Sequence, residues 1–120
     1  MPGQDTLPVI VGSESTFDEI IANETNKLIV VDFYADWCGP CKMIAPLFVK
    51  LAGEHTDVKF LKVDVDALTG VAGKHKVTAM PTFKYFYNRK EVGEVIGAHP
   101  QKIGEKIEEL KKKIESGEFQ

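Results

Sequence analysis

The feature that most constrains the fold is the run from Leu28 to Tyr34, which is rich in β-branched and aromatic residues and shows no polar alternation. A strand with one wet face alternates between apolar and polar residues, whereas a strand covered on both faces reads as a continuous apolar run. This run therefore predicts a central strand in a sheet with helices on both faces. Asp32 is the only charged residue within it.

Strand-like and helix-like segments alternate on either side of this run. Further strands are expected at Val9 to Val11, Val58 to Val65, Phe83 to Tyr87 and Glu91 to Ile96. Helices are expected from about Ser15 to Asn23, over Met43 to Leu51, over Ala67 to His75 and from Pro100 to Ile114. The order β-α-β-α-β-α-β-β-α predicts an α/β fold, with a central mixed β-sheet of about five strands flanked by four α-helices.

Local signals mark where these helices begin and bend. Ser13, Ser15 and Thr16 offer N-cap oxygens at the start of the first helix. Ser15 with Asp18 resembles a capping box, with Asp in place of Glu. Asp66 is expected to cap the third helix, and Pro100 fits the first turn of the fourth. Pro46 lies inside the apolar pattern of the second helix and is expected to kink it.

Length and charge exclude several classes of protein. A chain of 120 residues suits a single domain, expected over residues 9–120 after a loose lead-in at residues 1–8. A net charge of -3 argues against nucleic-acid binding, and the longest apolar stretch is far shorter than a membrane span. No Lys or Arg precedes Lys27, so no signal or transit peptide is expected. We therefore expect the protein in the cytoplasm, with the nucleus open as a second location.

Two cysteines, Cys38 and Cys41, point to thiol chemistry. A bridge between them would close a loop too short to stabilise the fold appreciably, so a structural disulfide is a poor explanation. Cys38 is expected at the N-terminus of the second helix, where unpaired N–H groups and the helix dipole favour its thiolate. Cys41 follows one turn later and is expected to be shielded from solvent by its own helix. This asymmetry predicts that Cys38 attacks a substrate disulfide and that Cys41 resolves the mixed disulfide.

Asp32 is the candidate proton acceptor for Cys41. A carboxylate within an apolar strand is desolvated, which raises its pKa toward the working pH and suits it to general-base catalysis, directly or through a water. Lys62, on the neighbouring strand, is expected to modulate Asp32 electrostatically. The alternative is a carboxylate that is hydrogen-bonded and purely structural.

Gly39 and Pro40 shape the turn between the two thiols, and the fixed φ of proline stiffens it. A histidine between the cysteines would offer positive charge to the first thiolate, stabilise the reduced form and produce a stronger oxidant. Its absence favours a reductant.

Two other interpretations of the cysteine pair are open, an inert buried pair and one half of a zinc site. Zinc needs two further ligands, and the histidines at positions 55, 75 and 99 are 20 and 24 residues apart, unlike the close spacing of structural zinc sites. We expect no metal, and we expect these histidines on the surface.

The segment around the cysteines resembles one protein family closely. Trp37-Cys38-Gly39-Pro40-Cys41-Lys42 is the active-site motif of the thioredoxin family in full. Other family-like segments follow in the family's order and spacing, namely Val31-Asp32-Phe33, Lys62 to Asp66, Met80-Pro81-Thr82 and Gly97-Ala98. The resemblance extends from about Val9 to Ile114, is closest to the eukaryotic cytosolic members, and implies the thioredoxin fold.

The resemblance also implies a surface on which substrates dock. In thioredoxins the proline that matches Pro81 is cis and faces the thiols, and the backbone of the residue that matches Met80 pairs with an extended substrate segment. The expected surface is flat and apolar and consists of Trp37, Gly39, Pro40, Met80, Pro81, Gly97 and Ala98. Simple core packing is the alternative for Trp37 and Met80.

The function that the resemblance implies is general protein-disulfide reduction with no bound cofactor. Electrons would come from thioredoxin reductase and ultimately NADPH, and the expected clients are peroxiredoxins, methionine sulfoxide reductases and ribonucleotide reductase. The extra cysteines of some animal members are missing, so a monomer is expected. Two alternatives remain: a thiol oxidase or isomerase of the same fold, and a non-catalytic binding module that uses the apolar patch around Trp37.

Overall fold

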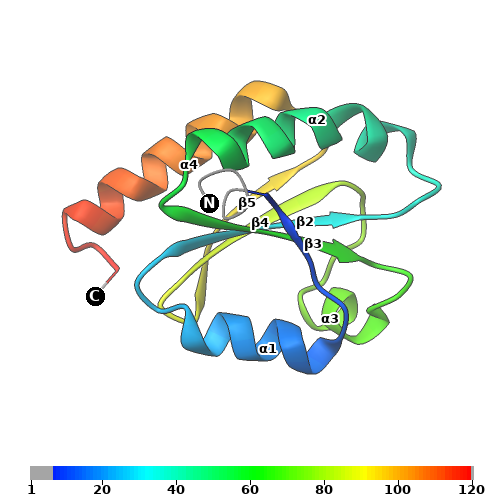
Figure 1. The fold of residues 1–120 in the computed structure, drawn as a ribbon, viewed down its shortest axis with the longest axis horizontal. Coiled ribbons are helices and arrows are strands. Elements are labelled where there is room, and N and C mark those ends of the chain that lie inside the picture. Colours follow the sequence, from blue (N-terminus) through cyan, green and yellow to red (C-terminus); the bar gives the residue numbers. More distant parts are fainter. Residues whose placement is uncertain (1–6, 120) are drawn as a thin grey trace.

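The computed structural model describes residues 7–119 (Figure 1), so most of the expected lead-in lies outside the described residues. Within them, strands and helices alternate as the sequence predicts. The strands are β1 (Val9–Ile10), β2 (Leu28–Tyr34), β3 (Val58–Asp64), β4 (Thr82–Tyr87) and β5 (Lys90–Ile96). The helices are α1 (Glu14–Asn23), α2 (Gly39–Glu54), α3 (Thr69–Lys74) and α4 (Pro100–Glu115).

The strands form one mixed sheet in the order β1-β3-β2-β4-β5. β1, β3 and β2 run parallel, whereas β4 runs antiparallel to β2 and β5 antiparallel to β4. β2 is therefore the central strand, and every residue in it except Tyr34 is buried. The register places Asp32 of β2 between Lys62 of β3 and Phe83 of β4. This topology confirms the predicted mixed α/β fold.

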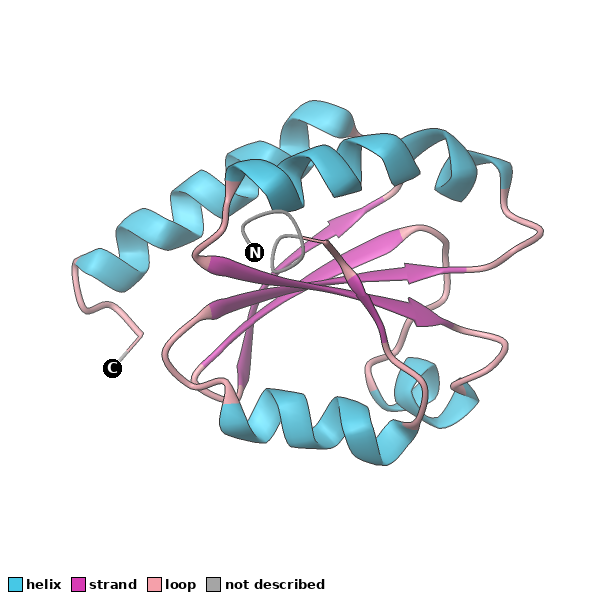
Figure 2. Ribbon diagram, in the orientation of Figure 1, coloured by secondary structure: helices cyan, strands magenta, loops and turns pink. Residues whose placement is uncertain are grey.

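Helices cover both faces of the sheet, as the continuous apolar run in β2 predicts (Figures 1 and 2). α1 and α3 lie on one face, and α2 and α4 lie on the other (Figure 1). Val31 and Phe33 belong to the core that includes α1 and α3. Leu28 and Val30 belong to the core that includes α2 and α4. Because side chains alternate along a strand, Asp32 points to the same face as Val30, the face covered by α2 and α4.

One of the three N-cap candidates of the first helix is confirmed, whereas the predicted capping box is wrong. Ser13 is the N-cap of α1, and its Oγ accepts a 3.1 Å hydrogen bond from the Thr16 N–H. Its backbone is extended, with a φ of -152°, which is the conformation that an N-cap residue needs. Ser15 and Asp18 lie inside the helix instead of forming a capping box.

The predicted cap of the third helix is also wrong. α3 begins at Thr69 after Leu68, and no side chain caps it. Asp66 lies further upstream, where its N–H donates a 2.9 Å hydrogen bond to Asp64 Oδ1. Its own carboxylate accepts a hydrogen bond from Trp37, so it is not available to the helix.

The two prolines of the long helices occupy the positions that the sequence indicates. Pro100 opens α4, where its missing N–H costs nothing, and α2 continues through Pro46 to Glu54. The kink at Pro46 stays a prediction. No helix among residues 7–119 is long and apolar enough to cross a membrane.

Candidate active site

The two cysteines lie at the junction between the central strand and α2. β2 ends at Tyr34 and α2 begins at Gly39, so that Cys38 is the N-cap residue of the helix. The Cys41 N–H donates a 3.1 Å hydrogen bond to Cys38 Sγ, which takes the place of the usual side-chain oxygen of an N-cap. Cys38 and Cys41 form a disulfide, with Cα atoms 5.3 Å apart. The predicted position of Cys38 at a helix N-terminus is confirmed.

The two cysteines do not differ in solvent exposure. Each has 4% of its area exposed, so the prediction that Cys41 is shielded is confirmed, but Cys38 is equally buried and the predicted asymmetry in exposure is wrong. The reason is that a second segment covers Cys38, since the carbonyl oxygen of Met80 lies 3.7 Å from its sulfur. The residues that flank Cys38 in the chain are exposed, namely Trp37, Gly39 and Pro40. The asymmetry between the two thiols therefore lies in their surroundings.

The segment that covers Cys38 contains a cis peptide bond between Met80 and Pro81, as the family resemblance implies. The Gly97 N–H donates a 2.8 Å hydrogen bond to the Pro81 carbonyl oxygen. This bond joins the loop after β5 to the segment that covers Cys38. Gly97 has a φ of +96°, in the left-handed region that favours glycine. The structure thus brings together Cys38, Met80, Pro81 and Gly97, with Ala98 next in the chain.

Trp37 is exposed beside the disulfide, with 68% of its area accessible, so it does not pack in the core. Its Nε1–H donates a 2.8 Å hydrogen bond to Asp66 Oδ2, which orients the indole. The sequence analysis missed Asp66 as a site residue because it assigned the carboxylate to a helix cap. A usable signal was present, since Asp66 closely follows β3, and the carboxyl ends of neighbouring parallel strands meet at one edge of a sheet.

Asp32 is buried without a partner on the face of the sheet that α2 covers. It is 1% exposed, and neither carboxylate oxygen has a hydrogen-bond partner among the described residues. The alternative of a hydrogen-bonded structural carboxylate thus finds no support among these contacts. Burial raises the pKa of Asp32 from 3.8 to about 7, and the positive charge of Lys62 opposes this rise.

Lys62 lies opposite Asp32 in the parallel pairing of β2 with β3. Its ammonium is 4.6 Å from the centre of the Tyr34 ring, within the range of a cation–π contact. This contact holds the positive charge near the end of β2. The structure therefore places a cation on the strand next to Asp32, as electrostatic modulation requires.

The three histidines have different surroundings. His55 is 9% exposed, and its Nδ1 lies 2.8 Å from the Lys111 ammonium. The His75 ring is partly buried among three phenylalanine rings of the α1–α3 core, and this burial lowers its pKa. The surface prediction is therefore wrong for His55, which is buried. It holds only in part for His75, because a neutral imidazole packs well on aromatic rings. Among the described residues, no group of three or more His, Cys, Asp and Glu side chains is placed to hold a metal.

Comparison with known proteins points to one family. The family model described as Thioredoxin matches residues 8–109. Thioredoxin-1 of Saccharomyces cerevisiae is 53% identical over 93 residues, which cover 78% of this chain and 88% of the relative. Thioredoxin H2-1 of Oryza sativa is 45% identical over 111 residues, covering 91% of this chain and 80% of the relative. The crystal structure of thioredoxin from Trypanosoma brucei brucei has a TM-score of 0.86 at 37% identity, covering 93% of this chain and 97% of that one.

A disulfide at the start of the helix that follows the central strand, faced by a cis-proline segment, defines a thiol–disulfide oxidoreductase. With the sequence matches, this arrangement shows that the chain belongs to the thioredoxin family. It is a protein-disulfide reductase whose redox couple is Cys38 and Cys41.

Proposed function

We propose that Cys38 is the nucleophile of this general protein-disulfide reductase. Its thiolate attacks one sulfur of a client disulfide, so that a bond to the client forms while the client's S–S bond breaks and releases one client thiolate. The observation that carries this role is the hydrogen bond from the Cys41 N–H to Cys38 Sγ. That bond and the N-terminal end of the α2 dipole both stabilise negative charge on the sulfur.

Cys41 resolves the mixed disulfide, and Asp32 accepts its proton. The Cys41 thiolate attacks Cys38 Sγ, which re-forms the intramolecular disulfide and releases the second client thiolate, so two electrons pass to the client. Because burial raises the pKa of Asp32 to about 7, its carboxylate is a base matched to neutral pH. Lys62 tunes this base through its positive charge.

Clients dock on a surface around Cys38, here called the docking surface. It consists of Trp37, Gly39, Pro40, Met80, Pro81, Gly97 and Ala98. The exposed indole, the carbonyl of Met80 3.7 Å from the nucleophilic sulfur, and the hydrogen bond between Gly97 and Pro81 support this assignment. An extended client segment pairs with the backbone at Met80, which holds the client disulfide over Cys38.

Membership of the family supports a wider proposal about partners. Thioredoxin reductase returns the disulfide to the dithiol with electrons from NADPH, and the clients are peroxiredoxins, methionine sulfoxide reductases and ribonucleotide reductase. One similar solved structure, 37% identical, concerns thiol resolution in a yeast mitochondrial 1-Cys peroxiredoxin via glutathione and thioredoxin systems, which supports the first client class. The protein acts as a monomeric single domain over residues 9–120, without a bound cofactor, in the cytoplasm and the nucleus.

Two cysteine variants test the assignment of roles. Cys41→Ser is expected to accumulate a mixed disulfide with client proteins through Cys38, because the attack that releases the client is lost. Cys38→Ser is expected to form no mixed disulfide and to show no turnover. Mass spectrometry of the trapped complexes identifies the protein cysteine that holds the client. A client held through Cys41 would show that the roles of the two cysteines are reversed. If the wild type bound clients but showed no turnover, the protein would be a non-catalytic binding module.

A further inference from the structure

Tyr34 is the last residue of β2, and the thiol chemistry described above assigns it no role. It follows Asp32 by two positions in the same strand, so the two side chains point to the same face of the sheet. Lys62 and Asp64 lie opposite Asp32 and Tyr34 in the parallel register of β3. These four side chains therefore share the face that α2 and α4 cover (Figure 1).

Lys62 neighbours two carboxylates, Asp32 across the strand pair and Asp64 along its own strand, but it pairs with neither. Its ammonium lies instead 4.6 Å from the centre of the Tyr34 ring, which is the geometry of a cation–π contact. Among residues 7–119, no ion pair includes Lys62. Asp64 Oδ1 accepts hydrogen bonds from the backbone of the turn that follows β3. The contact that holds the Lys62 ammonium is therefore the one with the Tyr34 ring.

The Tyr34 hydroxyl is protonated at neutral pH. Burial raises its pKa above the usual value of 10.0, and the carboxylates of Asp64, Asp36 and Asp32 raise it further. The ring thus holds the ammonium through its π face and not through the charge of a phenolate. A phenylalanine at this position would make the same contact.

The position of the Lys62 ammonium affects Asp32, because Asp32 is buried and neither of its oxygens has a hydrogen-bond partner among the described residues. An ammonium in contact with this carboxylate would favour its charged form. A carboxylate that is stabilised in this way is a weaker base for the Cys41 proton. The contact with Tyr34 keeps the ammonium near Asp32 but not paired with it.

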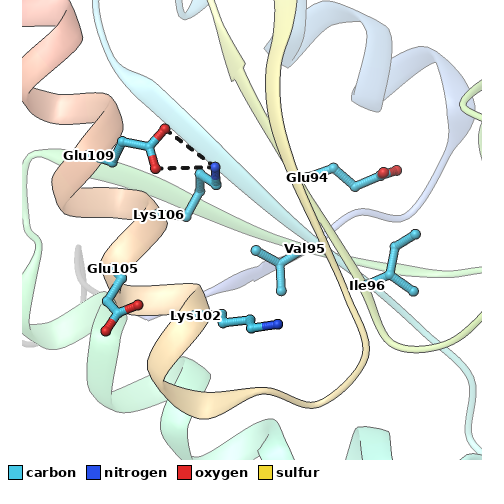
Figure 3. Close-up of a pocket in the computed structure, with 7 residues that line it drawn as sticks. All are labelled: Glu94, Val95, Ile96, Lys102, Glu105, Lys106 and Glu109. Carbon is cyan, nitrogen blue, oxygen red and sulfur yellow. Dashed lines mark hydrogen bonds and ion pairs between the residues drawn. The ribbon is translucent and has the colours of Figure 1, made fainter.

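The other charges on this side of the sheet lie elsewhere. The α2 residue Cys41 is held in the disulfide, Phe83 of β4 lies opposite Asp32, and Asp36 is exposed. The charged residues of α2 are also exposed, namely Lys42, Lys50 and Glu54. Four charged residues of α4 line a pocket with residues 94–96 of β5 (Figure 3), and β4 separates β5 from β2. Lys62 is therefore the cation that acts on Asp32.

We propose that Tyr34 is a positioning residue for the resolving step: its ring holds the Lys62 ammonium at the end of β2 and so leaves Asp32 free of an ion pair. This inference deepens the proposed function and rests on it, since Asp32 is the base that accepts the Cys41 proton. In this role Tyr34 acts through Lys62 alone and transfers no proton itself.

Carbon-13 NMR of the aspartate carboxyl groups tests this role. The oxidised protein is labelled at aspartate, and the Asp32 signal is identified by its loss in Asp32→Asn. The pH at half-titration is expected to be about 7 in the wild type. It is expected to fall by about one to three pH units in Tyr34→Leu, because the released ammonium pairs with Asp32. Tyr34→Phe keeps the ring and is expected to titrate like the wild type.

Loss of the ring also changes the packing around Asp32, and a second background separates this effect from the charge. Lys62→Met has no ammonium, so adding Tyr34→Leu to it is expected to leave the midpoint unchanged. Tyr87→Leu is the matched control at the end of β4, where the tyrosine ring packs against Phe119. The inference is overturned if Tyr34→Leu does not lower the midpoint, if the fall persists in the Lys62→Met background, or if Tyr34→Phe or Tyr87→Leu shows the same fall.

The rate of the resolving step separates this inference from the proposed function. One equivalent of 5,5′-dithiobis(2-nitrobenzoate) releases one nitrothiobenzoate when Cys38 attacks it and a second when Cys41 resolves the mixed disulfide. The pH dependence of the second release is expected to move to lower pH in Tyr34→Leu and to stay in place in Tyr34→Phe. If Asp32→Asn resolves as fast as the wild type at every pH, the proposed role of Asp32 fails, and this inference with it. If Asp32→Asn is slow but Tyr34→Leu keeps the wild-type pH dependence, this inference alone fails.

Discussion

Replacing Asp32 by asparagine tests the electrostatic cost of burying this carboxylate. Because burial raises the pKa of Asp32 from 3.8 to about 7, the folded state keeps a proton over a pH range in which the unfolded state has lost it. The contribution of this group to stability is therefore greatest below about pH 4 and falls as the pH rises to about 7. Asparagine has nearly the same shape but does not ionise, so Asp32→Asn lacks this fall.

The size of the effect follows from the shift in pKa. At 1.36 kcal/mol per unit, a rise from 3.8 to about 7 corresponds to about 4 kcal/mol. The free energy of unfolding of Asp32→Asn, relative to the wild type, is thus expected to increase by about 4 kcal/mol between pH 4 and pH 8. The buried amide adds an offset of about 1–3 kcal/mol that does not change with pH. The pH-dependent part alone reports on the carboxylate.

Urea unfolding of both proteins across this pH range measures the difference. Both are kept in the oxidised form, because cysteines in a disulfide do not titrate and so add nothing to the difference between the two proteins. Lys62→Met is the companion variant: without the opposing charge the pKa of Asp32 rises further, so the loss of stability becomes larger and continues to higher pH. A difference between wild type and Asp32→Asn that stays constant with pH would refute the reasoning.

Three further predictions concern the Cys38–Cys41 redox couple and the residues around it. The disulfide couple, followed by Trp37 fluorescence in a dithiothreitol or glutathione series, is expected to be more reducing than the glutathione pool; a strongly oxidising midpoint would support the oxidase or isomerase instead. Asp66→Ala releases the Trp37 indole and is expected to lower kcat/KM on protein clients about fivefold, for a lost contribution of about 1 kcal/mol, whereas an unchanged value would show that the bond does not orient the ring. Gly97→Ala is expected to destabilise the fold by about 1–3 kcal/mol in urea unfolding, because its φ is +96° and a Cβ there would lie 3.0 Å from the His99 ring. The control, Gly53→Ala in α2, has open space around it and is expected to add about 0.5–1 kcal/mol; equal effects at both positions would contradict the argument.

Much of the fold could be predicted because its signals are local. The unbroken apolar run of β2 requires cover on both faces, and the helices on the two faces of the sheet provide it. The caps were harder, because several polar residues near a helix start compete for one backbone position. At the start of α1 the extended backbone of Ser13 decides the competition, and a sequence alone does not report that angle.

The exposure of the cysteines shows the same limit at the site. Their spacing places both at the first turn of a helix, but how much water reaches each sulfur depends on what packs above it. Met80 is 42 positions from Cys38 in the chain, and its carbonyl covers the sulfur only after β4 has paired with β2. The predicted difference in exposure failed because it considered one helix alone.

The sequence by itself determined the elements of the fold, the cysteine pair at a helix start and the buried position of Asp32, because each follows from spacing and polarity over a few neighbouring residues. Only the tertiary structure decided that Asp66 orients Trp37 across 29 positions of chain, and that Gly97 is joined to the segment covering Cys38 through Pro81. Contacts between distant segments depend on how sheet and helices pack, and packing is a property of the whole chain.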